Sequence, residues 1–204
     1  MGVDIETAFV DAGETQINLS GGGTLNQLDG NLQVENLPVE LAELFYPLPA
    51  RVIGDLDLAA TFGGSLANPI VQGEATVENT EVNDYAIETV AADFNYRNAV
   101  LNLNSEVALD SAYAPVTIQG NVPYALPFMT VQPPTDRLAI NAVIPNNGLE
   151  VINAFTDGQV LWQGGQGNVS VEVGGTLAQP AVVGLASFRD GTISSPQLGE
   201  DITG

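Results

Sequence analysis

The sequence predicts an all-β protein built on an antiparallel sheet, with one or two short helices. Apolar and polar residues alternate with a period of two along most of the chain, as in strands with one buried and one solvated face. Clusters of Gly, Asn and Asp separate the alternating segments, and such clusters form turns. The chain has 204 residues, of which 45% are hydrophobic and 14% charged. This composition supports a folded domain and is opposite to that of disordered chains.

Ten segments show the alternation, and each is expected to be a strand. In the first of them the pattern places Phe9 on the apolar face and Ala8 on the polar face. The ten segments are 3–9, 28–34, 56–62, 71–77, 90–96, 99–103, 116–118, 138–144, 169–173 and 182–188. Turns are expected at 21–23, 63–64, 79–83, 98, 146–148, 157–158, 164–165, 174–175 and 190–191.

Two segments predict short helices. Segment 38–45 has Pro38 at the first helical position, Asn36 near the N-cap and apolar residues at one-face spacing. Segment 147–155 has Asn146 or Asn147 as its cap. Each helix is expected to cover an end or an opening of the sheet.

Charge excludes several classes of function. Asp and Glu number 25, Lys and Arg only 4, and the formal net charge is −21. Nucleic-acid binding depends on clustered cations, so no nucleic acid is expected as a partner. The chain has no His, Cys or Lys, which removes Ser–His and Cys–His catalysis, Schiff bases, P-loops and common zinc sites. The four cations are spread singly along the chain: Arg51, Arg97, Arg137 and Arg189.

Carboxylate pairs remain as candidates for glycoside hydrolysis or calcium binding. They are Asp55 with Asp57 and Glu78 with Glu81, and the alternation places them on the solvated face. Acids on such a face usually serve solubility. We therefore expect no enzyme, no catalytic residue, no metal site and no cofactor, and we interpret Trp162 as a packing anchor beside the second helix.

The chain contains an internal repeat, approximately 25–110 and 138–204, the second copy being truncated. Segment 63–69, Gly-Gly-Ser-Leu-Ala-Asn-Pro, matches segment 174–180, Gly-Gly-Thr-Leu-Ala-Gln-Pro, and the alternating flanks match as well. Gly adopts positive φ and Pro stops central-strand pairing, so each copy predicts a hairpin. We expect residues 1–204 to be a single fragment of a longer repeat chain.

Three stretches resemble a known family: 32–38 with the following 54–58, and the two Gly-Gly turns with their next strand, 63–73 and 174–184. They are similar to the C-terminal repeats of TamB, the translocation and assembly module, an AsmA-like group of bridge-like lipid-transfer proteins with cyanobacterial members. The resemblance covers roughly residues 20–195 and depends on repeat texture.

The resemblance implies an elongated, curled antiparallel sheet, a β-taco-like open trough with an apolar interior. It implies a periplasmic location within an inner-membrane-anchored chain that extends toward the outer membrane, and partnership with an Omp85-type outer-membrane barrel. The parts that would make both attachments lie outside this sequence.

An apolar sheet face must be covered, because soluble proteins rarely expose large apolar patches. A packed sandwich or barrel, an open trough holding an apolar ligand, and stacking on neighbouring repeats all satisfy this requirement. Aliphatic and small residues dominate the face, and aromatics make up only 6% of the chain, which leaves room along a groove; with the resemblance, the trough is favoured. Its expected hydrophobic lining is Leu56, Leu58, Phe62, Val71, Val77, Phe94, Leu101, Leu103, Ile140, Val169, Val171, Val173 and Phe188.

Two functions follow as hypotheses. The first is a conduit or scaffold whose groove carries phospholipid acyl chains between the membranes, or shields client outer-membrane β-strands during assembly. The second is an extracellular, adhesin-like structural β-repeat with a packed core, stabilised by calcium. Open sheet edges would also allow strand addition and self-association.

Overall fold

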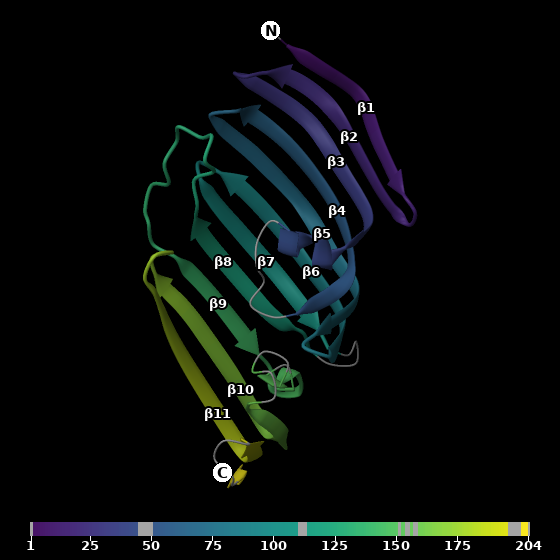
Figure 1. Cartoon of the computed structure of the whole chain (residues 1–204). Helices are drawn as coiled ribbons and strands as arrows, with labels where there is room; N and C mark the ends of the chain where they lie inside the picture. Colours follow the sequence, from purple (N-terminus) through teal and green to yellow (C-terminus); the bar gives the residue numbers. More distant parts are fainter. Residues whose placement is uncertain are drawn as a thin grey trace.

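The computed structural model describes residues 2–44, 51–109, 114–150, 152–153, 156, 159–195 and 201–203. Its strands form one antiparallel sheet in which each strand pairs with its neighbours in sequence (Figure 1). In these residues the first and last strands are not paired with each other, so the sheet is open and does not close into a barrel. The strands are β1 (Val3–Ala12), β2 (Thr15–Thr24), β3 (Gln27–Pro38), β4 (Val52–Ser65), β5 (Asn68–Val82), β6 (Tyr85–Arg97), β7 (Val100–Ala108), β8 (Val116–Pro123), β9 (Ala139–Ile144), β10 (Leu161–Gly175), β11 (Pro180–Ser194) and β12 (Asp201–Thr203).

The ten expected strands are present, and β2 and β12 are additional. The turn expected at 21–23 is wrong: these glycines lie inside β2 and pair with both β1 and β3. The turns expected at 164–165 and 190–191 are also wrong, because they lie within β10 and β11 at an irregular register. In each case glycine accommodates close strand contact or a bulge. The turn expected at 157–158 lies outside the described residues.

The alternation also misplaces Phe9. A register shift between Ile5 and Ala8 puts Ala8 opposite Leu19 on the apolar face and Phe9 opposite Asn18 on the polar face. A single-residue irregularity reverses the faces of all later residues in a strand, because the side-chain period is two.

The helix expected at 38–45 is a short 3₁₀ helix, and the helix expected at 147–155 lies partly outside the described residues. η1 spans Val39–Leu44 and contacts β4, whereas Asn36 is a left-handed residue of β3 (φ 52°) and not a cap. η2 spans Asn146–Gly148 with Pro145 as its N-cap, and residues 152–153, inside the expected helix, are α-helical. Asn146 Oδ1 instead accepts a hydrogen bond from Gly167 N at 2.6 Å. No helix among the described residues is long and apolar enough to cross a bilayer.

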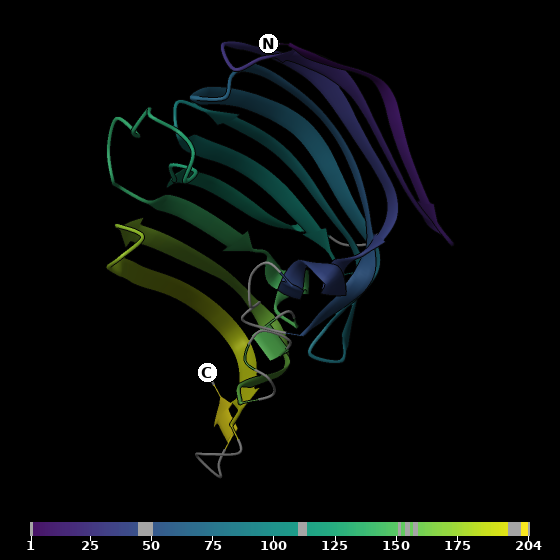
Figure 2. The ribbon, with the colours of Figure 1, turned by 45° about the horizontal axis from the view of Figure 1, so that its top comes forward.

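The sheet curls because several strands carry bulges. Register shifts occur in β3–β4 beside Asn36 and in β4–β5 beside Gly54, and bulges bend strands and increase their twist. Asp57 Oδ1 accepts a hydrogen bond from Asn36 N at 2.8 Å, which supports the first bulge. Figure 2 shows the strands arching over η1, which lies on the concave side of the sheet.

Two hairpins with matching sequences have matching geometry. In β4–β5 Gly64 is paired with Pro69, and in β10–β11 Gly175 is paired with Pro180. The two glycines have φ of 81° and 80°. A Cβ on either would lie within 2.6 Å of a backbone oxygen across the turn, so only glycine fits both positions.

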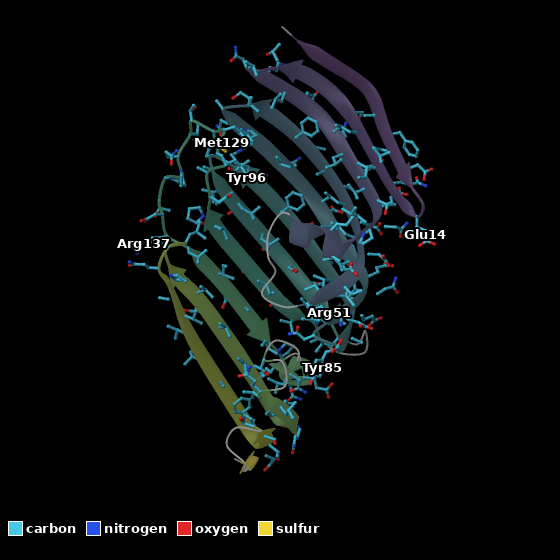
Figure 3. All side chains as sticks on the ribbon, viewed as in Figure 1. Glu14, Arg51, Tyr85, Tyr96, Met129 and Arg137 are labelled. Atoms are coloured by element: carbon cyan, nitrogen blue, oxygen red, sulfur yellow. The ribbon has the colours of Figure 1, made fainter. Side chains whose placement is uncertain are left out.

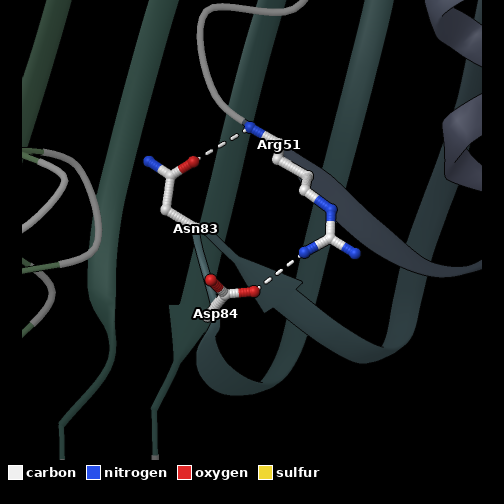
Figure 4. Close-up of polar contacts among 3 residues, drawn as sticks. All are labelled: Arg51, Asn83 and Asp84. Carbon is white, nitrogen blue, oxygen red and sulfur yellow. Dashed lines mark hydrogen bonds and ion pairs between the residues drawn. The ribbon is translucent and has the colours of Figure 1, made fainter.

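A polar link joins the start of β4 to the β5–β6 turn (Figure 4). Asn83 Oδ1 accepts from Arg51 N at 3.0 Å, and Asn83 N donates to Arg51 O at 2.9 Å. Arg51 also forms an ion pair with Asp84 at 2.8 Å. Both charged side chains are largely exposed, so this ion pair contributes at most about 1 kcal/mol.

Two clusters of buried side chains lie at opposite ends of the strands, and Val34, Ala60 and Ser105 are buried along the middle of the sheet. One cluster contains Val82, Ile87, Val107 and Val116, at the strand ends near η2. The other contains Tyr96, Ala99 and Met129, at the opposite strand ends. We call these clusters the lower rim and the upper rim; the apolar face between them forms the trough.

Candidate functional site

Two continuous rows of apolar residues cross the concave face. Each row passes through directly paired residues from β1 to β11. At about 4.8 Å between strands, the rows extend for about 48 Å along the curled sheet. The first row is Ala8, Leu19, Leu32, Ala60, Gly73, Phe94, Leu103, Gly120, Ile140, Val173 and Val182. The second is Val10, Ile17, Val34, Leu58, Ala75, Ala92, Ser105, Ile118, Ala142, Val171 and Gly184.

Ser105 is the polar member of these rows, and its hydroxyl is satisfied within the protein. Its Oγ donates a hydrogen bond to Ala91 O at 2.8 Å, and the residue is buried. A hydroxyl paired in this way presents little unmet hydrogen-bonding demand to a ligand. The rows therefore form a continuous apolar surface.

The opposite face is polar over most of the sheet. Paired across the middle strands are Glu74, Asp93, Asn104, Gln119 and Asn141. A groove of about 810 Å³ crosses this face, lined by side chains that include Gln33, Glu74 and Asp93. Such a lining is solvated and does not suit an apolar ligand.

The thirteen residues expected to line the trough all lie on its apolar face, as the strand registers require. Twelve of them are half-buried, and Phe188 is exposed. Phe188 packs at the end of the trough, over Gly167 and against Trp162 with ring centroids 5.3 Å apart. Val71 and Leu101 pack against the upper rim. The other lining residues are at least partly exposed to solvent on the face between the rims.

The upper rim is formed by a loop that the alternation could not predict. After β8, Ala125, Leu126 and Met129 fold over the ends of the strands and pack near Tyr96. Tyr96 and Met129 lie side by side in Figure 3. The Tyr96 hydroxyl donates to Tyr124 O at 2.8 Å, and Thr130 N donates to Ala67 O at 3.2 Å. The loop is thus tied to the β4–β5 turn.

Burial raises the pKa of the Tyr96 phenol above its ordinary value of 10.0; the neighbouring Tyr124 raises it further, while a hydrogen bond with the Leu126 backbone lowers it. The folded state therefore holds the phenol proton more tightly, and this stability is complete below pH 10 and lost as pH rises above it. We expect the free energy of unfolding to fall less steeply above pH 10 in Tyr96→Phe than in the native chain. Urea unfolding at pH 9, 10 and 11 measures it, and with no Lys or Cys in the chain few other groups titrate there. Equal pH profiles would contradict this prediction.

The lower rim is closed by the segment between β9 and β10. A Cβ on Gly148 would lie 3.1 Å from Val116, so this segment packs directly on the cluster. Leu149 is fully buried. Trp162 is also buried, and its backbone N donates to Asn153 Oδ1 at 2.7 Å. Trp162 thus packs beside this segment and is not displayed as a binding surface.

The aspartates of the first carboxylate pair have hydrogen-bond partners within the protein. No group of three His, Cys, Asp or Glu side chains in the described part of the chain is placed to hold a metal ion. Asp55 Oδ2 accepts from Asn79 Nδ2 at 3.0 Å, and Asp57 holds the bulge at Asn36. Both aspartates therefore have structural partners.

Comparisons of the chain with protein-family models, with curated proteins and with solved structures return no match. The resemblance to TamB repeats therefore stays a prediction. The fold and the trough define the class of the protein: an open, curled antiparallel sheet with one apolar and one polar face.

Proposed function

We propose that the trough binds lipid acyl chains and that the chain serves as a non-enzymatic segment of a lipid conduit. The observation that carries this proposal is the pair of apolar rows that cross the sheet from β1 to β11. Many of their residues, such as Leu58, Leu103 and Val171, are partly exposed between the two rims, and the opposite face is polar. A ligand of this trough would be long, flexible and apolar.

The energetics favour such a ligand. Exposing acyl chains to water costs about 0.8 kcal/mol per methylene, so a chain of about 14 methylenes costs on the order of 10 kcal/mol. An apolar surface that runs across the whole sheet removes much of this cost at every position along it. The headgroup can stay in solvent at the open side, so transport needs no specific polar pocket.

Native mass spectrometry of the purified protein, followed by organic extraction, tests this proposal. We expect phospholipid or fatty acid bound in near-stoichiometric amounts, and uptake of a fluorescent fatty acid by the delipidated protein. A ligand-free mass without any uptake would contradict the proposal.

The second candidate is a calcium-stabilised structural β-repeat, and a melting experiment separates it from the conduit. Asp55 and Asp57 have hydrogen-bond partners within the protein, and no group of three acids in the described part of the chain could hold a metal ion. We expect the melting temperature to be the same in calcium and in excess chelator. A large fall in the chelator would favour the calcium-stabilised repeat.

The remaining expectations follow from the resemblance alone. The periplasmic location, the Omp85-type partner and the shielding of client β-strands stay predictions. The proposed binding of acyl chains does not depend on them, because it is argued from the trough itself.

A further inference from the structure

Three hairpin turns at the upper-rim end of the strands display a leucine in the same sequence context. The β2–β3, β4–β5 and β10–β11 turns each contain Gly-Gly-Ser/Thr-Leu, at 22–25, 63–66 and 174–177. Their leucines, Leu25, Leu66 and Leu177, are 69%, 39% and 51% exposed. Two aromatic residues of the loop after β8, Tyr124 and Phe128, are 50% and 54% exposed. We call these five side chains the tip surface.

Backbone hydrogen bonds join these turns and the loop into one border of the sheet. Leu66 N donates to Leu25 O at 3.0 Å, which links the first two turns. The loop is hydrogen-bonded to the second turn, and near its end Arg137 forms a β-bridge with Thr176 of the third turn. Single exposed apolar residues are common on protein surfaces, but these five are held together along one border.

Charge distinguishes this border from the rest of the molecule. Its turns and loop, residues 24–27, 65–68, 97–100, 124–138 and 175–180, contain two arginines and one aspartate, whereas the whole chain carries a net charge of −21. The β1–β2 and β5–β6 turns at the opposite end contain Glu14 and Asp84. Figure 3 shows Arg137 at the upper-rim end and Glu14 at the other. An apolar border without excess acid can therefore approach a surface from which the opposite end is directed away.

The two arginines of this border are available to a ligand. Arg97 and Arg137 are exposed, and neither forms an ion pair with a described residue. Arg51, at the opposite end, is paired with Asp84. Guanidinium groups bind phosphate oxygens, and aromatic side chains are enriched where an apolar phase meets water. The border thus combines groups suited to phosphate with groups suited to an apolar layer beneath it.

We propose that the tip surface docks on a phospholipid bilayer, with its apolar side chains below the headgroups and Arg97 and Arg137 at the phosphates. The side chains project from separate turns, and a fluid bilayer accepts them without the matching pockets that a folded partner would have to provide. A zwitterionic bilayer fits best, because the acids elsewhere on the chain are repelled by an anionic one.

Docking would hold one border of the trough at the membrane surface, because the upper rim extends along the length of the trough. The strands would then stand on the membrane, with the acidic turns directed into water. The docking surface is argued from the turns and the loop, and it does not depend on acyl-chain binding in the trough.

Co-flotation with phosphatidylcholine vesicles tests the docking surface. We expect the native chain to float with the vesicles. Leu66→Asp should weaken binding at least threefold, and the combined Leu25→Asp, Leu66→Asp and Leu177→Asp variant at least tenfold. Val143→Asp is the matched control, because Val143 is also 39% exposed but lies on the polar face of β9, and it should bind as the native chain does. Urea unfolding verifies that the variants are folded.

Because the chain has no cysteine, single cysteines carrying an environment-sensitive dye report which end meets the lipid. Dye at Leu66→Cys or Leu177→Cys should shift its emission to the blue when vesicles are added. Dye at Glu14→Cys, in the β1–β2 turn at the opposite end, should not respond.

Several results would overturn the docking surface. They are a native chain that does not float, equal losses in Leu66→Asp and Val143→Asp, and equal dye responses at both ends. A dye shift that grows with protein concentration in the absence of vesicles would instead assign the tips to contacts between copies. Vesicle binding that is lost in Leu58→Asp but kept in Leu66→Asp would assign the contact to the trough. A chain that takes up fatty acid but never floats would overturn the docking surface and leave the proposed function standing.

Discussion

Fatty-acid uptake should fall at least tenfold in Leu58→Asp and remain unchanged in Ala59→Asp. The two positions are adjacent in β4, but Leu58 belongs to an apolar row of the trough and Ala59 faces the polar side. An ionised carboxylate in the trough must be desolvated by a passing acyl chain, which is costly. On the polar face the same charge remains in water.

Titration with a fluorescent fatty acid measures this difference, and urea unfolding verifies that both variants are folded. Leu58 is half-buried, so we expect Leu58→Asp to lower the free energy of unfolding by about 1–3 kcal/mol. Val171→Asp on β10, with Ser170→Asp as its control, repeats the experiment near the other end of the trough. Equal uptake by the folded trough and control variants would exclude the trough as the binding surface.

Leu149→Ala should lower the free energy of unfolding by about 2–5 kcal/mol, the range for a leucine removed from a packed site. Leu149 is fully buried beneath the lower rim, whereas Leu177, in the β10–β11 turn, is 51% exposed. Leu177→Ala should therefore change stability by less than about 0.5 kcal/mol.

Urea unfolding of both variants measures the difference between a buried and an exposed leucine. A loss below about 1 kcal/mol in Leu149→Ala would fall outside the usual range for buried leucines. It would show that the segment between β9 and β10 contributes little to the sheet. The lower rim would then depend on Val82, Ile87, Val107 and Val116 alone.

The sequence predicts the faces of most strands because alternation is local. Leu56 and Leu58 share a face with Phe62 whatever the rest of the chain does, since successive side chains of a strand point to opposite sides. Bulges break this rule without a clear sequence pattern, so the alternation predicts the wrong face for Phe9. The glycines at 21–23 resemble a turn, but strands on both sides keep them extended.

The helix expected at 147–155 illustrates another limit. Asn146, Asn147 and Gly148 are weak helix formers and form a 3₁₀ helix, whereas α-helix within the expected span is described at residues 152–153. Asn146 binds a backbone amide of β10 and not its own helix, which depends on a strand far along the chain. The loop that forms the upper rim is equally non-local, because Met129 packs on Tyr96, 33 positions earlier.

The apolar rows run along the direction of the interstrand hydrogen bonds, perpendicular to the strands. The length of the trough is therefore measured across the strands and its width along them. Strand length sets the width, while the number of strands sets the length. Duplicating a hairpin would lengthen the trough and preserve its cross-section, as the two matched Gly-Gly hairpins suggest. Inserting one residue within a strand would instead move the following side chains to the opposite face, so charged side chains would enter the trough. Adding or removing hairpins can therefore change the length of such a sheet, provided that the apolar residues of each strand stay on the trough face.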